Sequence, residues 1–204
     1  MATSFTGAYF SDSVSVSGNT FEAGSWGGGN PPPGPGEVGI SEFVYDAVGA
    51  DTGFEWVELY NRGSSLIDLT GYDLYAGHYF TFPSFSLNAG QFVVVHMKGT
   101  GVDSATDLYE NSTSGTDMNN TYGNLALFKN STHDSANIVD YVAYGVGTHA
   151  LEGTAVSASI WANGDLFPDV PAGHSIELKD PNIDTNQSGD WRNQATPSLG
   201  SWTP

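Results

Sequence analysis

The chain of 204 residues contains no cysteine, and it has only five lysines and arginines against 23 aspartates and glutamates. Without a thiol it can form no disulfide, no zinc–thiolate site and no cysteine nucleophile. The formal net charge of −18 repels phosphate backbones and anionic lipids, which argues against nucleic acid and membrane surfaces as partners and in favour of cations. Long apolar runs are also missing, since none approaches the roughly 20 residues that cross a bilayer. We therefore expect neither nucleic-acid binding nor membrane insertion.

Glycine, serine, threonine and asparagine are abundant instead. Together with the scarcity of lysine, this composition favours a secreted protein. No basic segment followed by an apolar one precedes the first predicted strand. We therefore expect an extracellular or cell-surface location, reached after removal of a signal peptide that is absent from this chain.

From residue 37 onward, short apolar segments alternate with turns, and no helical periodicity is found. The length suits one all-β domain, and the spacing of the segments predicts a β-sandwich over residues 37–204. Residues 99–124 are expected to form a polar surface excursion or a flap, and residues 150–171 a second connection. The predicted strands are Val38–Tyr45, Phe54–Tyr60, Leu66–Leu74, His78–Phe82, Gln91–Met97, Leu125–Lys129, Ile138–Tyr144 and Ser175–Leu178.

Residues 1–26 form a separate segment, the arm, with the alternation of an extended β-strand. Its even-numbered positions are mostly apolar and the odd-numbered positions between them are serines. A Gly/Pro-rich linker over residues 27–36 separates the arm from the sandwich. A single strand cannot bury its apolar face alone, so the arm must dock on another surface. Its predicted contact residues are Ala8, Phe10, Val14, Val16 and Phe21.

Several motifs of the predicted sandwich occur in a recognisable order. They are VGISEFVYDA, EWVELYN, LIDLTGYDLYAG, QFVVVH, IVDYVAYG and GHSIELKDPN. In sequence and order they resemble the lamin tail domain family, over residues 37–204. The resemblance implies an immunoglobulin-like β-sandwich and transfers no catalytic residue. In nuclear lamins the module contacts proteins and chromatin, but the acidity of this chain argues against chromatin.

The arm has a resemblance of its own. AYFSDSVSVSGNTFEAGSW is similar to the mature N-terminus of the camelysin and TasA-like matrix proteins. That resemblance implies extracellular fibres in which the N-terminal strand of one subunit inserts into the next. The alternatives are docking of the arm on its own domain and disorder. The partly stiff linker favours docking of the arm on a neighbouring molecule over docking on its own domain. A head-to-tail contact that does not close into a ring propagates as a filament.

The loop DPNIDTNQSGD carries a candidate calcium site made of Asp180, Asn182, Asp184 and Asp190. Oxygen ligands at such spacing can converge on Ca²⁺ when a loop curls around it. However, Thr185 stands where an EF-hand has its glycine, and Asx-rich turns usually satisfy their own backbone. We favour the turn interpretation and keep calcium as the alternative, and no cofactor is required.

No catalytic constellation is evident in the sequence, and we expect that the protein is not an enzyme. Glu55 and Glu58 are three residues apart, so on a strand they face opposite sides. The five histidines lack the spacing of paired metal ligands, and the Gly-rich linker lacks the lysine of a phosphate-binding loop.

Two features point to sugars. Trp26, Trp161, Trp191 and Trp202 are candidate platforms for carbohydrate, although aromatic residues in a small sandwich are more often core. Four asparagines begin N-glycosylation sequons, and three of them lie in or near the polar excursion. These four are Asn111, Asn119, Asn130 and Asn186.

The leading hypothesis is a secreted structural protein. It would assemble head to tail with copies of itself by inserting the arm into a neighbouring subunit. The competing hypothesis is a monomeric cell-surface adhesion or carbohydrate-binding module.

Overall fold

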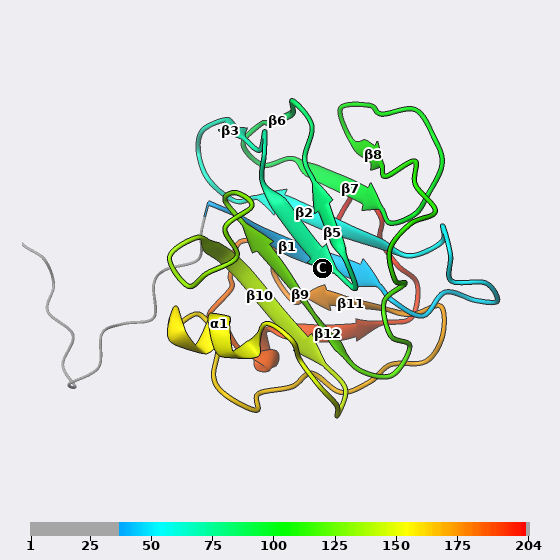
Figure 1. Ribbon diagram of the computed structural model, residues 1–204, viewed down its shortest axis with the longest axis vertical. Helices are drawn as coiled ribbons and strands as arrows, with labels where there is room; N and C mark the ends of the chain where they lie inside the picture. The colour runs from blue at the N-terminus through cyan, green and yellow to red at the C-terminus, as the bar shows by residue number, and fades with distance from the viewer. Residues whose placement is uncertain (1–36, 203–204) are drawn as a thin grey trace, which may run out of the picture. The chain divides into compact units, whose positions relative to one another are not determined.

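The computed structural model describes residues 37–202, which form an all-β, immunoglobulin-like sandwich (Figure 1). The predicted arm and the linker lie outside the described residues, and so do the contact residues proposed on the arm. Within residues 37–202, no helix is both long and apolar enough to span a membrane.

One layer is a six-stranded sheet, in the order β12-β11-β1-β2-β7-β8. All of its neighbouring strands are antiparallel except β7 and β8, which run parallel. The strands are β1 (Val38–Val44), β2 (Trp56–Asn61), β7 (Phe92–His96), β8 (Asp107–Tyr109), β11 (Ser175–Leu178) and β12 (Trp191–Gln194).

The other layer is a four-stranded antiparallel sheet, in the order β10-β9-β4-β5, and it faces the viewer in Figure 1. Its strands are β4 (Asp73–Ala76), β5 (Tyr79–Thr81), β9 (Gly123–Phe128) and β10 (Ile138–Tyr144). A small ribbon pairs β3 (Ile67–Asp68) with β6 (Ser86–Leu87). The short helix α1 (Glu152–Ser157) lies beside β10, and a 3-10 turn occupies Ser188–Asp190.

The core lies between the two sheets and is formed by alternating strand residues. Ile40, Val57 and Leu59 face it from the six-stranded sheet, and Leu74 and Leu127 face it from the other, all with no exposed surface. Each such side chain contributes about 1.5–3 kcal/mol of burial free energy. The described residues thus form a continuous hydrophobic core.

The predicted strands are largely confirmed. β10 and β11 have the predicted bounds, and β1, β2, β5, β7 and β9 differ from them by one or two residues at an end. The single strand expected over Leu66–Leu74 is wrong, because a turn at Gly71, with φ +78°, divides that stretch into β3 and β4. The prediction also missed α1, β6, β8 and β12. These elements are too short to show a period. The three strands form by pairing with distant strands, whereas α1 is held by local hydrogen bonds such as that from the Ala158 N–H to the Thr154 carbonyl.

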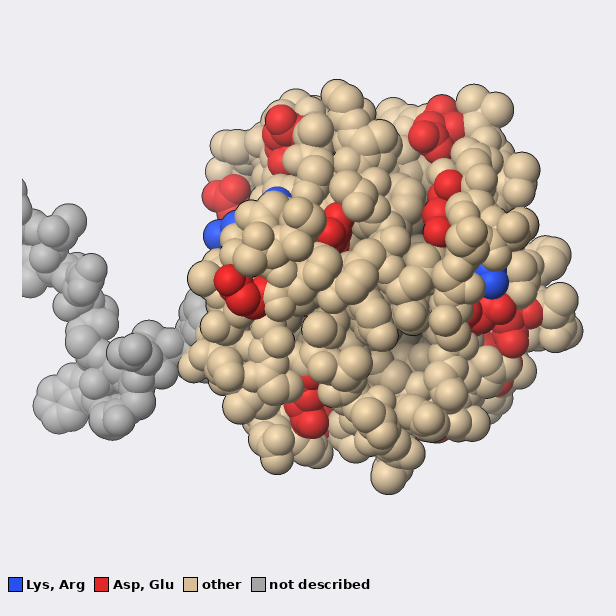
Figure 2. All heavy atoms as spheres, viewed as in Figure 1, with Lys and Arg blue, Asp and Glu red and all other residues tan. Residues whose placement is uncertain are grey.

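Asp and Glu are scattered over the face shown in Figure 2, with few Lys and Arg between them. No single large acidic patch gathers there. The acidity therefore acts as a general field around the domain.

Candidate functional site

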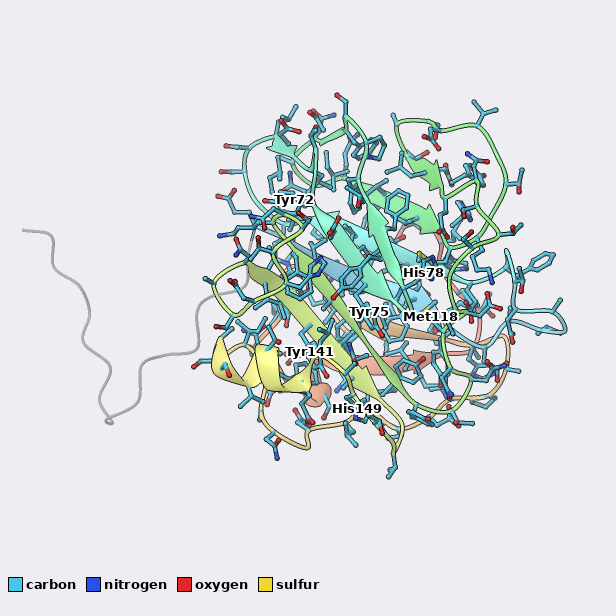
Figure 3. All side chains as sticks on the ribbon, viewed as in Figure 1. Tyr72, Tyr75, His78, Met118, Tyr141 and His149 are labelled. Carbon is cyan, nitrogen blue, oxygen red and sulfur yellow. The ribbon has the colours of Figure 1, made fainter. Side chains whose placement is uncertain are left out.

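A hollow of about 270 Å³ opens where the ends of β4, β9 and β10 meet the excursion of residues 99–124. Its wall combines three aromatic rings with an amide, a carboxylate and a thioether. In Figure 3, the labels of Tyr75, His78 and Met118 gather at this side of the front sheet. The main lining side chains are Tyr75, Asp117, Met118, Tyr122, Asn124 and Tyr144.

The excursion is pinned to the sandwich rather than free to swing as a flap. His78, at the β4–β5 turn, bonds the Thr116 carbonyl through Nδ1 (2.9 Å) and Glu110 Oε1 through Nε2 (2.8 Å). Gly77 has φ +80°, and a Cβ at that position would lie only 2.7 Å from the Thr116 carbonyl oxygen. Glycine is therefore required where the turn and the excursion meet.

Asn124 carries a buried polar group at the hollow. The residue is 5% exposed, and its Nδ2 has no hydrogen-bond partner among the described residues. Its Oδ1 accepts a long hydrogen bond of 3.5 Å from the Leu151 N–H. Because an unsatisfied buried donor costs about 1–3 kcal/mol, this amide is a local cost to stability in the wall of the hollow.

Tyr144 supports the same wall from β10. Its hydroxyl donates to the Asn119 carbonyl at 2.7 Å, and its ring stacks on Tyr45 at a centroid distance of 4.0 Å. Burial raises the pKa of Tyr144 far above its ordinary value of 10. The hydroxyl therefore stays protonated, and it acts as a fixed hydrogen-bond donor.

Glu55 lies behind Met118 and is 1% exposed. Its Oε2 accepts the Met118 N–H at 2.9 Å, whereas its Oε1 has no hydrogen-bond partner among the described residues. Burial raises the pKa of Glu55 to about 8, and the negative charge of Asp117 adds to this. At neutral pH the group is therefore mostly a carboxylic acid, which can donate as well as accept a proton.

A second cluster, the glutamate row, lies on the outer face of the six-stranded sheet. Glu177, Glu42 and Glu58 stand side by side on β11, β1 and β2, and all three are buried. The C-terminal segment covers them. The Ser198 N–H donates to Glu42 Oε1 (3.0 Å), and the Gly200 N–H donates to Glu58 Oε2 (2.7 Å).

The Ser198 hydroxyl lies between two members of the glutamate row, and also 2.8 Å from the Ser201 carbonyl. The Ser198 hydroxyl lies 2.9 Å from Glu42 Oε2 and 2.8 Å from Glu177 Oε1, but it has only one proton to donate. Burial raises the pKa of Glu42, and it raises that of Glu58 to about 8, with a further rise from the neighbouring carboxylates. Arg192 pairs with Glu177 at 2.7 Å, so Glu177 is the member with a direct cationic partner. The row fastens the C-terminal segment to the sheet.

Glu55 and Glu58 do not meet. The Glu55 carboxyl bonds the backbone of the excursion, and the Glu58 carboxyl bonds Ser41 and Gly200. The two groups therefore have separate surroundings, as their spacing in the sequence predicts.

The predicted calcium ligands use their oxygens within the loop. Asp180 accepts the Asn182 N–H (2.9 Å), and Asp190 accepts the Thr185 N–H (2.6 Å). Asn182 also accepts the Tyr60 hydroxyl (3.2 Å). Within residues 37–202, no group of three or more His, Asp or Glu side chains is arranged to hold a metal ion. This geometry fits the turn interpretation, and calcium stays a prediction.

Asp184 points inward instead, to a buried charge cluster. It is 2% exposed, and its Oδ2 lies 3.3 Å from Arg62 Nη1. The Arg62 Nε donates to the Pro181 carbonyl at 3.0 Å. Asp140 accepts the Ile40 N–H (2.6 Å) in the same region, and burial raises its pKa although the charge of Arg62 opposes this. The cluster ties the loop to the core.

The predicted sugar-related residues are dispersed. Trp161 and Trp191 are buried and belong to the core, so neither is an open platform, and Trp202 is partly buried with Arg192 at 6.0 Å from its ring. Trp26 lies outside the described residues. The sequon residues Asn111, Asn119 and Asn130 are exposed, and Asn186 is partly buried. Of the four, Asn119 lines the hollow.

The sequence interpretation missed the hollow and the glutamate row. A signal for the row was present, because ISE, WVE and SIE each place a glutamate inside an otherwise apolar strand. A charged residue at such a position is expected to be paired. The hollow had no comparable signal, since its residues come from distant segments.

A family model described as Lamin Tail Domain matches residues 31–146 of the chain. The match covers β1 to β10, and β11 and β12 lie beyond it but complete the same six-stranded sheet. A search of the curated proteins finds no match.

Proposed function

The chain belongs to the lamin tail domain family, and from that premise we propose that it is a non-catalytic, extracellular structural protein. In this proposal the arm of one copy adds a strand to the sandwich of the next. Its resemblance to the N-termini of camelysin and TasA-like matrix proteins supports this role. Copies joined head to tail would form a filament when the contact does not close.

The observation that carries the proposal is the open edge of β5. Among residues 37–202, β5 pairs with β4 alone, with Phe80 opposite Leu74. The next hydrogen bonds between the two strands run from the Ala76 N–H to the His78 carbonyl and from the Phe82 N–H to the Tyr72 carbonyl. Each lies two residues along the strands from the Phe80–Leu74 pair. In an antiparallel ladder the backbone groups between such positions point away from the partner strand. Those groups belong to Tyr79 and Thr81, whose side chains are exposed.

An unpaired edge of this kind is a template for strand addition. The occupant we assign to it is the arm of another copy, because the arm has the alternation of a strand. Main-chain hydrogen bonds would provide affinity, and the apolar positions Phe10, Val14 and Val16 would fix the register.

A peptide of residues 6–21 tests this assignment against residues 37–204, which carry their own core. We expect the peptide to bind, Val14→Asp to abolish binding, and Ser15→Asp, on the opposite face, to weaken it far less. Equal effects of the two substitutions would contradict the assigned face. A peptide that does not bind would contradict the addition of the arm to the sandwich of another copy.

A second candidate function is carbohydrate binding at the hollow. It is favoured by Tyr75 and Tyr122 in the wall of the hollow, next to Asn124, whose Nδ2 has no hydrogen-bond partner among the described residues. Ring faces and a buried donor suit the apolar faces and hydroxyls of a sugar. Titration of neutral monosaccharides into the protein and into Asn124→Leu, followed by NMR, distinguishes this function. Identical spectra with and without sugar would eliminate it.

A further inference from the structure

Lys98 and Asp117 meet at the edge of the hollow in a close ion pair. The Lys98 Nζ lies 3.0 Å from Asp117 Oδ1, and the two side chains are 9% and 30% exposed. Asp117 Oδ1 is itself buried, and the lysine reaches it without the geometry of a hydrogen bond. The other oxygen, Oδ2, accepts the Thr52 hydroxyl at 2.8 Å. The carboxyl group is thus held in place by one oxygen while the amine lies against the other.

The backbone of Lys98 is constrained to present this amine. Lys98 is the second residue after the end of β7 and has φ +52°, a left-handed conformation that is uncommon for a residue with a side chain. Its N–H donates to Glu110 Oε2 at 2.6 Å, and its Nζ also donates to the Gly115 carbonyl at 3.3 Å. Such strained residues cluster at sites with a function.

Glu55 is hydrogen-bonded to the residue that follows Asp117 and to the residue that precedes Lys98. Its carboxyl accepts the N–H of Met118, which follows Asp117, and its carbonyl accepts the N–H of Met97, which precedes Lys98. The charges of Asp117 and Lys98 both act on it. Its unpartnered Oε1 and its protonated state make it a group that can give up a proton and take one back.

We propose that Lys98 and Asp117 become joined by an intramolecular isopeptide bond, with Glu55 as the proton-transfer group. The contact supplies the nucleophile and the carbonyl carbon. The chain has no cysteine, so this bond would give the domain a covalent cross-link between the end of β7 and the excursion. The inference stands independently of the proposed assembly through the arm.

The reaction is a condensation that needs no further reagent. A proton moves from the Lys98 ammonium to the Asp117 carboxylate, which gives a neutral amine and a neutral carboxylic acid. The Nζ lone pair then forms the C–N bond at Cγ of Asp117. Glu55 gives its proton to the departing hydroxyl, which leaves as water, and regains a proton from the nitrogen. The products are one amide and one water, and no atom is oxidised or reduced.

Mass spectrometry of the full chain tests the bond directly. We expect the intact protein, after prolonged incubation at neutral pH, to weigh one water less than its sequence. Trypsin cuts after lysine and arginine, so the unlinked chain gives separate peptides 63–98 and 99–129. The linked chain gives instead one peptide, 63–129, that lacks one water, because an acylated lysine is not cleaved.

Three variants identify the atoms that react. Lys98→Arg keeps the positive charge but removes the amine, so we expect the full sequence mass and cleavage after position 98. Asp117→Asn changes the leaving group, so we expect loss of ammonia in place of water. Glu55→Gln keeps the acceptor for the Met118 N–H but cannot pass a proton, so we expect a folded, unlinked protein by circular dichroism and mass.

Several results would overturn the proposal. The full sequence mass in the wild-type chain, with complete cleavage after Lys98, would mean that the contact is an ion pair only. Loss of water with normal cleavage after Lys98 would place the dehydration elsewhere, for example in a succinimide. Unchanged bond formation in Glu55→Gln would remove Glu55 from the reaction.

Discussion

Glu58→Gln should remove a large part of the pH dependence of stability. Glu58 lies at the β2 end of the domain's buried glutamate row, 1% exposed, and burial raises its pKa to about 8 from an ordinary value of 4.5. Because the folded-state pKa is the higher one, the unfolded chain releases this proton first as the pH rises. The contribution of Glu58 is therefore complete below about pH 4.5 and is lost as the pH rises through about 8.

The size of the effect follows from the two pKa values. One unit of difference between the folded and unfolded pKa corresponds to about 1.36 kcal/mol. The difference between 4.5 and about 8 therefore lowers the free energy of unfolding by up to about 5 kcal/mol between acidic and alkaline pH. Glutamine resembles the protonated acid and still offers one acceptor to Gly200 or Ser41. The variant should therefore be more stable than the wild type at about pH 9 and close to it at about pH 5.

Denaturant unfolding at the two pH values and at one ionic strength measures this difference. Glu37→Gln is the matched control, because it makes the same chemical change at an exposed position. We expect the control to follow the wild type. If the unfolding free energies of the wild type and Glu58→Gln ran parallel across this pH range, burial of an uncharged Glu58 would be refuted.

Three further predictions concern the charge cluster, the β4–β5 turn and the predicted calcium loop. Arg62→Met leaves the carboxylates of Asp140 and Asp184 without their cation, and we expect denaturant melts to show a loss of about 3–5 kcal/mol; an unchanged midpoint would contradict this. Gly77→Ala should cost about 1–3 kcal/mol because of its positive φ, measured as a lower melting temperature, at about 2–4 °C per kcal/mol. For the loop of residues 180–190, we expect thermal melts in Ca²⁺ and in chelator to coincide at matched ionic strength. If the loop binds calcium, Ca²⁺ at about a hundred times its Kd would instead raise the free energy of unfolding by about 2.7 kcal/mol, and this result would support the calcium site.

The long strands of the fold could be predicted from the sequence because their apolar pattern is local. The run FVVVH predicts β7, and IVDYVAY predicts β10 with both of its bounds. Other elements have no such pattern. β12 reads WRNQ and is a strand because Arg192 lies opposite Glu177 on β11, which the sequence of that segment alone does not encode.

The sites were less predictable than the fold. The loop of residues 180–190 was identified as a cluster of oxygens, yet the inward turn of Asp184 depends on Arg62, which is far away in the sequence. The contact of Lys98 with Asp117 likewise depends on how the excursion folds back over β7. Long-range contacts of this kind leave no periodic signal in the sequence.

The most direct test of the proposed assembly is the mass of the particle in solution. Light scattering should be measured over a range of concentrations for the full chain with its N-terminus exposed and for residues 37–204. Our account predicts that the full chain forms species whose mass grows with concentration, whereas residues 37–204 remain a folded monomer. A full chain that stays monomeric at every concentration would contradict it.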